Sequence, residues 1–131
     1  MKFLDHKEKD ETTVCLFDKR GKYTGKAMRN PKDTPNRWIG YKIAEKRAWI
    51  DFFTKETYRK SIMLYAIKNL NNDIKHNCGF IDPKIQRRIN LKIRDYNNDI
   101  KFNKAEIAKL EKGIKDETEV REKINKKVKK N

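Results

Sequence analysis

Two glycines and a lysine in the stretch DKRGKYTGKAMR, residues 18–29, are spaced almost as in a phosphate-binding loop. Such a loop needs four residues between its glycines, then a lysine and a hydroxyl residue that binds magnesium. Here three residues separate Gly21 from Gly25, and Ala27 follows Lys26 where the hydroxyl should stand. The loop should also run into a helix whose N-terminus receives the phosphates, but a segment with two prolines follows. The stretch therefore predicts a basic β-hairpin rather than a nucleotide site.

The side chains at and beside this turn have the chemistry of a nucleic-acid contact. Lys and Arg bind phosphates, and an aromatic ring can stack on a base. The alternative is a hairpin tip whose charges only keep it solvated. The contact residues predicted here are Lys19, Arg20, Lys22, Tyr23, Lys26 and Arg29.

A second basic run lies in PKIQRRINLKIR, residues 83–94, with no acid between Asp82 and Asp95. A solvated helix face usually alternates charges of both signs, so the missing acids favour a binding role. The alternative is a solubilising face opposite an apolar seam. The contact residues predicted here are Lys84, Arg87, Arg88, Lys92 and Arg94.

The segment KINKKVKKN, residues 123–131, forms a third basic run without any acid. It is either a basic tail or an extension that follows a phosphate backbone. It has no aromatic residue of the kind that anchors a helix at a membrane surface, so we expect no membrane contact. The contact residues predicted here are Lys126, Lys127, Lys129 and Lys130.

Residues that could hold a metal or act as a nucleophile are few. The only thiols and imidazoles belong to Cys15, Cys78, His6 and His76, and their spacing suits a tetrahedral zinc poorly. The single serine, Ser61, falls inside a predicted helix and not on the tight turn that a serine nucleophile needs. We therefore expect no metal and no cofactor and favour a protein without catalysis. A nuclease whose acids the pattern does not reveal stays the open alternative.

The net charge of the chain is the most informative feature of its composition. Its 131 residues contain 34 Lys and Arg against 19 Asp and Glu, which gives a net charge of +15 and a pI near 9.8. Such a chain is attracted to nucleic acid or to an acidic protein surface. The basic set comprises 25 Lys and 9 Arg, and Lys acts as a point charge whereas Arg reads guanine edges. The composition thus favours contact with the phosphate backbone.

The N-terminal part of the chain predicts a small antiparallel sheet. TTVCLFD and KYTGKAM read as two strands of a β-hairpin at 12–28, preceded by a charged and loosely ordered segment at 1–11. Residues 38–53 are ambiguous. Ile39, Tyr41 and Ile43 would share one face of a strand, while a helix could begin at Thr34-Pro35. Because Lys42, Glu45 and Lys46 interrupt the apolar arc of a helix, we favour a second hairpin over a helix.

The C-terminal part predicts two helices that form an antiparallel hairpin. The first covers residues 54–77, with a buried stripe at Met63, Ile67, Leu70 and Ile74. Asp82 and Pro83 suit the N-cap and first position of the second helix, residues 83–130.

Mainly apolar residues recur along the second helix at the a and d positions of a heptad repeat, and we call this stripe the seam. At about 1.5 Å per residue, a helix over 54–77 covers only half of this seam. The rest then needs another partner, and Asn103 would set the register of a homodimer. Glu117 and Arg121 interrupt the seam near its end. The residues of the uncovered seam are Asn103, Ile107, Leu110 and Ile114.

These patterns predict a single α+β domain, with a sheet-rich part at 1–53 and a helical hairpin with a basic extension at 54–131. Two cysteines form no disulfide framework and no run of 18 apolar residues occurs, so we expect a cytoplasmic protein. The favoured function is non-catalytic binding of nucleic acid, mainly through the phosphate backbone, with RNA or the shape of a duplex recognised. The alternative is an interaction or inhibitor protein of a phage or mobile element, which docks on an acidic or nucleic-acid-binding surface of a partner.

Overall fold

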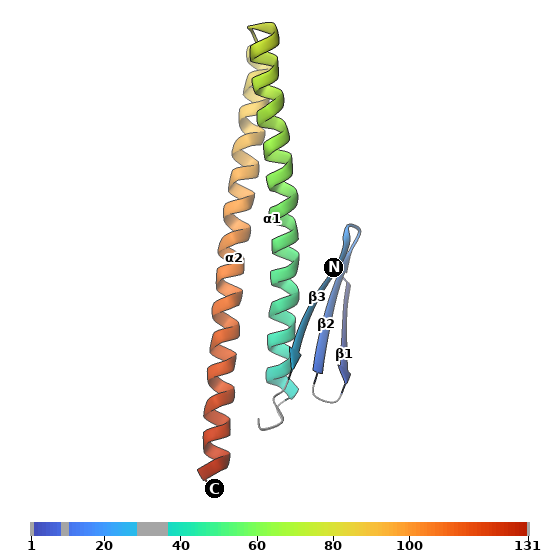
Figure 1. The fold of residues 1–131 in the computed structure, drawn as a ribbon, viewed down its shortest axis with the longest axis vertical. Coiled ribbons are helices and arrows are strands. Elements are labelled where there is room, and N and C mark those ends of the chain that lie inside the picture. The colour runs from blue at the N-terminus through green and yellow to red at the C-terminus, as the bar shows by residue number, and fades with distance from the viewer. Residues whose placement is uncertain (1, 9–10, 29–36, 131) are drawn as a thin grey trace. The chain divides into compact units, whose positions relative to one another are not determined.

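The computed structural model of the protein describes the backbone over residues 2–8, 11–28 and 37–130, and side chains over residues 11–28 and 39–127. An antiparallel sheet followed by two long helices makes an α+β fold with a helical hairpin, which confirms the predicted fold class (Figure 1). The elements are β1 (Lys2–Glu8), β2 (Glu11–Asp18), β3 (Gly21–Met28), α1 (Arg37–Cys78) and α2 (Pro83–Lys130).

The sheet has three strands in the order β1-β2-β3, and both neighbouring pairs are antiparallel. The predicted hairpin at 12–28 is confirmed as β2 and β3, with Asp18 opposite Gly21 and Leu16 opposite Tyr23. The prediction of a loosely ordered segment at 1–11 is wrong, because β1 pairs along its length with β2. Backbone hydrogen bonds form this pair whatever the charge of the side chains.

The chain forms two compact units. Unit 1 comprises residues 1–53 and 106–131, and unit 2 comprises residues 54–105. Each unit therefore contains a part of α1 and a part of α2. Residue 53, where we expected the sheet-rich part to end, coincides with one limit of unit 1, but residues 106–131 belong with the sheet rather than with the rest of the helical hairpin.

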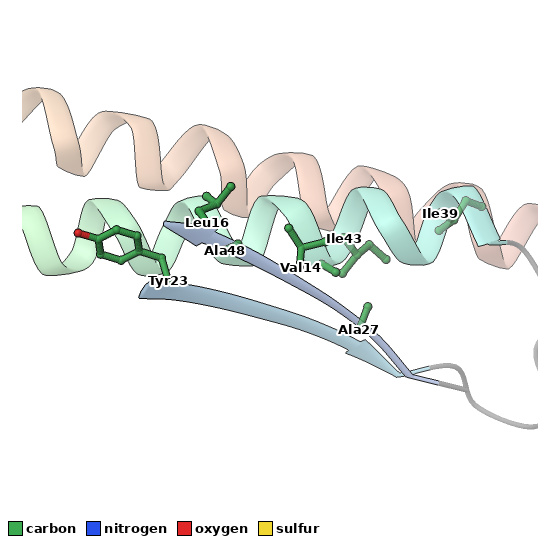
Figure 2. Close-up of a cluster of buried hydrophobic side chains, with 8 residues drawn as sticks. Val14, Leu16, Tyr23, Ala27, Ile39, Ile43 and Ala48 are labelled. Carbon is green, nitrogen blue, oxygen red and sulfur yellow. The ribbon is translucent and has the colours of Figure 1, made fainter. Parts of the chain in front are cut away.

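The core of unit 1 lies between one face of the sheet and the first turns of α1. Strand alternation sends every second side chain of β2 and β3 to this face, and α1 meets it with isoleucines and alanines (Figure 2). Among the described residues this core comprises Val14, Leu16, Tyr23, Ala27, Ile39, Ile43, Ala44 and Ala48.

Gly25 is the point at which sheet and helix come closest. A Cβ atom added there would overlap the carbonyl oxygen of Ala44 and the backbone nitrogen of Ala48, and would lie 2.8 Å from the carbonyl carbon of Arg47. Backbone thus packs on backbone, which requires a glycine on the strand and small residues on the helix. The glycine that resembles a phosphate-binding residue is a packing residue.

The preferred prediction of a second β-hairpin at 38–53 is wrong, because these residues form the start of α1. Ile39, Ile43 and Ala44 follow the helical period and face the sheet. Two of the three charged residues that argued against a helix have a partner elsewhere in unit 1. Lys42 and Lys46 place their Nζ atoms 3.8 Å and 3.7 Å from Oε1 of Glu117 on α2.

This polar contact interrupts the seam between α1 and α2 in unit 1. The Glu117 side chain is 17% exposed, so its carboxylate is held mainly between the two lysines. Gly113 makes room for one of them, because a Cβ there would lie 2.7 Å from Cε of Lys46. The acid that breaks the heptad pattern in the sequence is therefore an ion-paired member of the seam.

In unit 2 the two helices also contact each other. Leu64 and Ile67 are half-buried on α1, and Nζ of Lys60 lies 3.3 Å from Oδ2 of Asp99 on α2. The predicted buried stripe on this helix is only half correct, since Met63 and Leu70 are 46% and 54% exposed. Two helices alone cover one stripe of each other, so side chains beside that stripe stay in solvent.

We predict that Gly25→Ala lowers the free energy of unfolding by about 2–3 kcal/mol, because the added Cβ overlaps backbone that cannot move without separating strand and helix. Urea denaturation measures the effect. Lys26→Ala is the matched control on the next residue, with an exposed side chain, and should change stability by less than about 0.5 kcal/mol. An equal effect of both substitutions would contradict the close approach.

We also predict that Lys46 and Glu117 are energetically coupled. Glu117→Leu should cost about 1–2 kcal/mol, since it leaves two half-buried lysines beside an apolar side chain. The double substitution Lys46→Met with Glu117→Leu should recover most of this loss. A double-mutant cycle in urea gives the coupling energy, and purely additive effects would show that the pair contributes nothing.

Candidate nucleic-acid interface

The turn between β2 and β3 holds Lys19 and Arg20 in solvent. Oδ1 of Asp18 accepts hydrogen bonds from the backbone nitrogens of Arg20 at 2.8 Å and Gly21 at 3.0 Å. An aspartate that bonds the backbone two and three residues ahead stabilises a tight turn. The two basic side chains therefore project from a fixed point of unit 1.

The prediction that Tyr23 stacks on a nucleic-acid base is wrong. Tyr23 is 1% exposed, and its ring packs edge-on against Phe52 of α1 with centroids 5.0 Å apart. Its hydroxyl donates to the carboxylate of Asp18 at 3.1 Å. A ring enclosed on both faces by the core has no surface for a base, so the aromatic member of the hairpin is structural.

The other basic residues of β3 lie on the face of the sheet away from α1. Lys22 and Lys26 are exposed, and Lys26 lies 3.6 Å from Glu11. The free edge of β3 is occupied by α1. Arg47 donates to the carbonyl oxygen of Lys26 at 2.6 Å, and Asp51 accepts from the backbone nitrogen of Thr24 at 3.0 Å. Arg29 lies outside the described residues.

The start of α2 carries five exposed cations. Asp82 caps the helix as predicted, with its Oδ1 accepting from the backbone nitrogen of Lys84 at 2.8 Å. The predicted contact residues of this run are all exposed: Lys84, Arg87, Arg88, Lys92 and Arg94.

Two of these five side chains have contacts with neighbouring residues. Arg94 lies 3.9 Å from Asp95, and Lys92 lies over the ring of Tyr96 at 5.9 Å from its centroid. Within the described part of the chain, no carboxylate forms an ion pair with the side chains of Lys84, Arg87 and Arg88. These three cations stand at positions i, i+3 and i+4 and thus share one helix face.

The basic C-terminal run lies far from the hairpin turn within unit 1. Lys126 and Lys127 are exposed on α2, while the side chains of Lys129 and Lys130 lie outside the described residues. Tyr23 beside the turn contacts Phe52, whereas the guanidinium of Arg121 approaches Gly40. Those two levels of α1 are about 18 Å apart at 1.5 Å per residue. These two runs therefore form separate patches.

The seam that we expected to be uncovered is partly buried. Asn103 is 7% exposed in unit 2, and Ile114 packs against the core of unit 1. Ile107 and Leu110 are half-buried between them. The expectation of an outside partner assumed a first helix that begins at residue 54, and α1 begins at Arg37. The argument for a homodimer through this seam therefore loses its basis.

Sequence reasoning missed two exposed apolar features of unit 2. Tyr58, Ile62 and Tyr65 are 69%, 50% and 69% exposed on α1, and Phe80 in the connection between the helices is 70% exposed. The first three follow an i, i+4, i+7 pattern that places them on one helix face. The spacing of these three residues is visible in the sequence, but the same spacing is equally typical of a buried helix face.

Over residues 11–28 and 39–127, no group of three or more His, Cys, Asp and Glu side chains is placed to hold a metal ion. Cys15 is buried and Cys78 is exposed, and neither forms a disulfide. No described helix is both long and apolar enough to cross a membrane.

Comparison with protein-family models, with curated proteins and with solved structures found no significant match to this chain.

Proposed function

We propose that this protein binds nucleic acid without catalysing a reaction on it, and that it contacts mainly the phosphate backbone. The observation that carries the proposal is the group of exposed cations at the start of α2. Lys84, Arg87 and Arg88 share a helix face and have no carboxylate partner among the described residues. Exposed cations without partners are available to replace the counterions of a polyanion.

The surroundings of this group reinforce its positive potential. Unit 2 contains twelve Lys and Arg against five Asp and Glu, a balance of +7. The N-terminus of α2 adds the positive end of a helix dipole. The capping carboxylate of Asp82 offsets part of this charge. A phosphate near the first turns of α2 therefore meets mainly cationic side chains.

The chemistry of the cations indicates what kind of recognition to expect. Lysine contacts a phosphate as a point charge and carries no base code, and it outnumbers arginine across the chain. The side chains of Arg87 and Arg88 are exposed on α2, where they can contact phosphates. Recognition of backbone shape in structured RNA or a duplex fits this set better than a base sequence.

We predict that Lys84→Gln/Arg87→Gln/Arg88→Gln weakens binding to RNA and DNA by at least tenfold in low salt. The slope of log affinity against log salt should fall by about 2–3, because each phosphate contact contributes 0.7–0.9 to it. Fluorescence anisotropy at two or more salt concentrations gives both values.

The matched control is Lys112→Gln/Lys115→Gln/Lys123→Gln, which removes the same charge from exposed positions of α2 in unit 1. It should change affinity by less than threefold. Equal losses of affinity in both triple variants would show that binding depends on net charge alone and not on the position of these cations. Absence of binding by the unaltered protein at low salt would contradict the proposed function.

A second candidate function is an interaction or inhibitor protein, of the kind that phages and mobile elements encode, and the exposed stripe Tyr58–Ile62–Tyr65 favours it. Tyrosines dominate the centres of many protein interfaces, and an i, i+4, i+7 stripe fits an apolar groove. Residues 57–72 contain no acid. The partner in this case is a protein whose groove has an acidic rim.

We predict that Tyr58→Ala/Tyr65→Ala abolishes capture of such an acidic partner from nuclease-treated lysate while leaving nucleic-acid affinity unchanged. Asn69→Ala/Asn72→Ala is the control, because it alters exposed residues of the same helix without removing apolar surface. Quantitative mass spectrometry compares the two captures. Equal capture by both double variants would exclude the stripe as a docking surface.

A further inference from the structure

Phe80 is the most exposed large apolar residue of the described chain, with 70% of its surface in solvent. It lies in the short connection between α1 and α2, and both ends of this connection are fixed. Gly79 has a φ of 65° and donates its backbone N–H to the carbonyl oxygen of Lys75 at 3.0 Å. Asp82 caps α2 through the backbone nitrogen of Lys84. The ring is therefore presented by an ordered turn.

Packing does not account for the position of this ring. An apolar residue just after a C-terminal glycine commonly folds back on the last helical turn and closes the cap. Phe80 does not do so, and its ring forms no aromatic contact with any described residue. Its neighbour Ile81 is half-buried in the same connection.

Basic residues of both helices flank Phe80 in the sequence. Between residues 74 and 94 the only acid is Asp82, and its Oδ1 is engaged in the helix cap. The last turn of α1 and the first two turns of α2 supply the basic residues of this tip: Lys75, His76, Lys84, Arg87 and Arg88.

We propose that this tip binds an unpaired base of a nucleic acid, with Phe80 stacked on the base and the flanking cations on the adjacent phosphates. The inference rests on the proposed function and adds a ligand class to it: single strands, loops and overhanging ends. An aromatic ring beside cations is the common arrangement for binding single-stranded nucleic acid. The ring supplies a contact that every base accepts, so no sequence preference is needed.

An unpaired base fits this tip better than a base inside a duplex. Bases within a duplex already stack on their neighbours, and separating a base step costs about as much as one ring-to-base contact gains. One phenylalanine on a turn therefore gives no net gain at an intact step. At an unpaired base the same contact is gained without that cost, while the cations bind phosphates of either form.

The test measures binding of the full chain to a single-stranded RNA and to a blunt-ended duplex of the same length by fluorescence anisotropy. Phe80→Ala should weaken single-strand binding about fivefold or more, the effect of losing one stacked base. Duplex binding should change less than twofold. Phe80→Trp should retain or strengthen single-strand binding. Ile85→Ala, a control at a 51% exposed aliphatic residue of the same tip, should change neither.

The outcomes separate this inference from the proposed function. If the unaltered protein binds neither probe at low salt, both fail. If it binds and Phe80→Ala leaves single-strand affinity unchanged, the stacking contact is excluded and the phosphate-binding function stands. An equal loss on both probes would also overturn the inference, because it would show a contact that does not depend on an unpaired base. Circular dichroism of each variant confirms that the helices are intact.

Discussion

The contact of β3 with α1 at Gly25 is the constraint on which the arrangement of unit 1 depends. Because the strand backbone lies directly on the backbone of Ala44 and Ala48, the sheet is held at a short distance from the helix. Larger side chains pack on either side of this point, where Tyr23 meets Phe52 on α1. Two polar contacts, from Arg47 and Asp51, then fix the free edge of β3. An edge strand covered in this way cannot pair with another chain at that edge.

Local sequence patterns correctly predict those helices and strands whose apolar residues fit only one period, either that of a strand or that of a helix. The turn chemistry of residues 18–21 and the alternation in β2 identify the hairpin, and Asp82-Pro83 identifies the start of α2. The same approach gives the wrong prediction for residues 38–53, because their apolar residues fit both the period of a strand and that of a helix. The deciding partner of Lys42 and Lys46 is Glu117, more than 70 residues away in sequence. No local pattern contains such information.

The candidate interface was predictable in its charges and not in its aromatic residues. Exposure of the basic residues follows from the cost of burying unpaired charge. The prediction of a surface ring at Tyr23 neglects the register of the hairpin, which indicates a buried position. A turn at Lys19 and Arg20 places Tyr23 opposite Leu16, on the same face of the hairpin as an obvious core residue. Phe80 gave no such signal, because exposure of a residue in a short connection depends on how the two helix ends are capped.

Net charge alone does not distinguish the two units, since unit 1 carries +8 and unit 2 carries +7. What differs is how the cations are used. In unit 1 several serve the fold, as Lys46 does with Glu117 and Arg47 does with the edge of β3. At the start of α2 in unit 2, the side chains of Lys84, Arg87 and Arg88 have no such use among the described contacts. Charge anywhere on the surface would serve solubility. Three adjacent cations without acids repel one another, and a bound anion would relieve that repulsion.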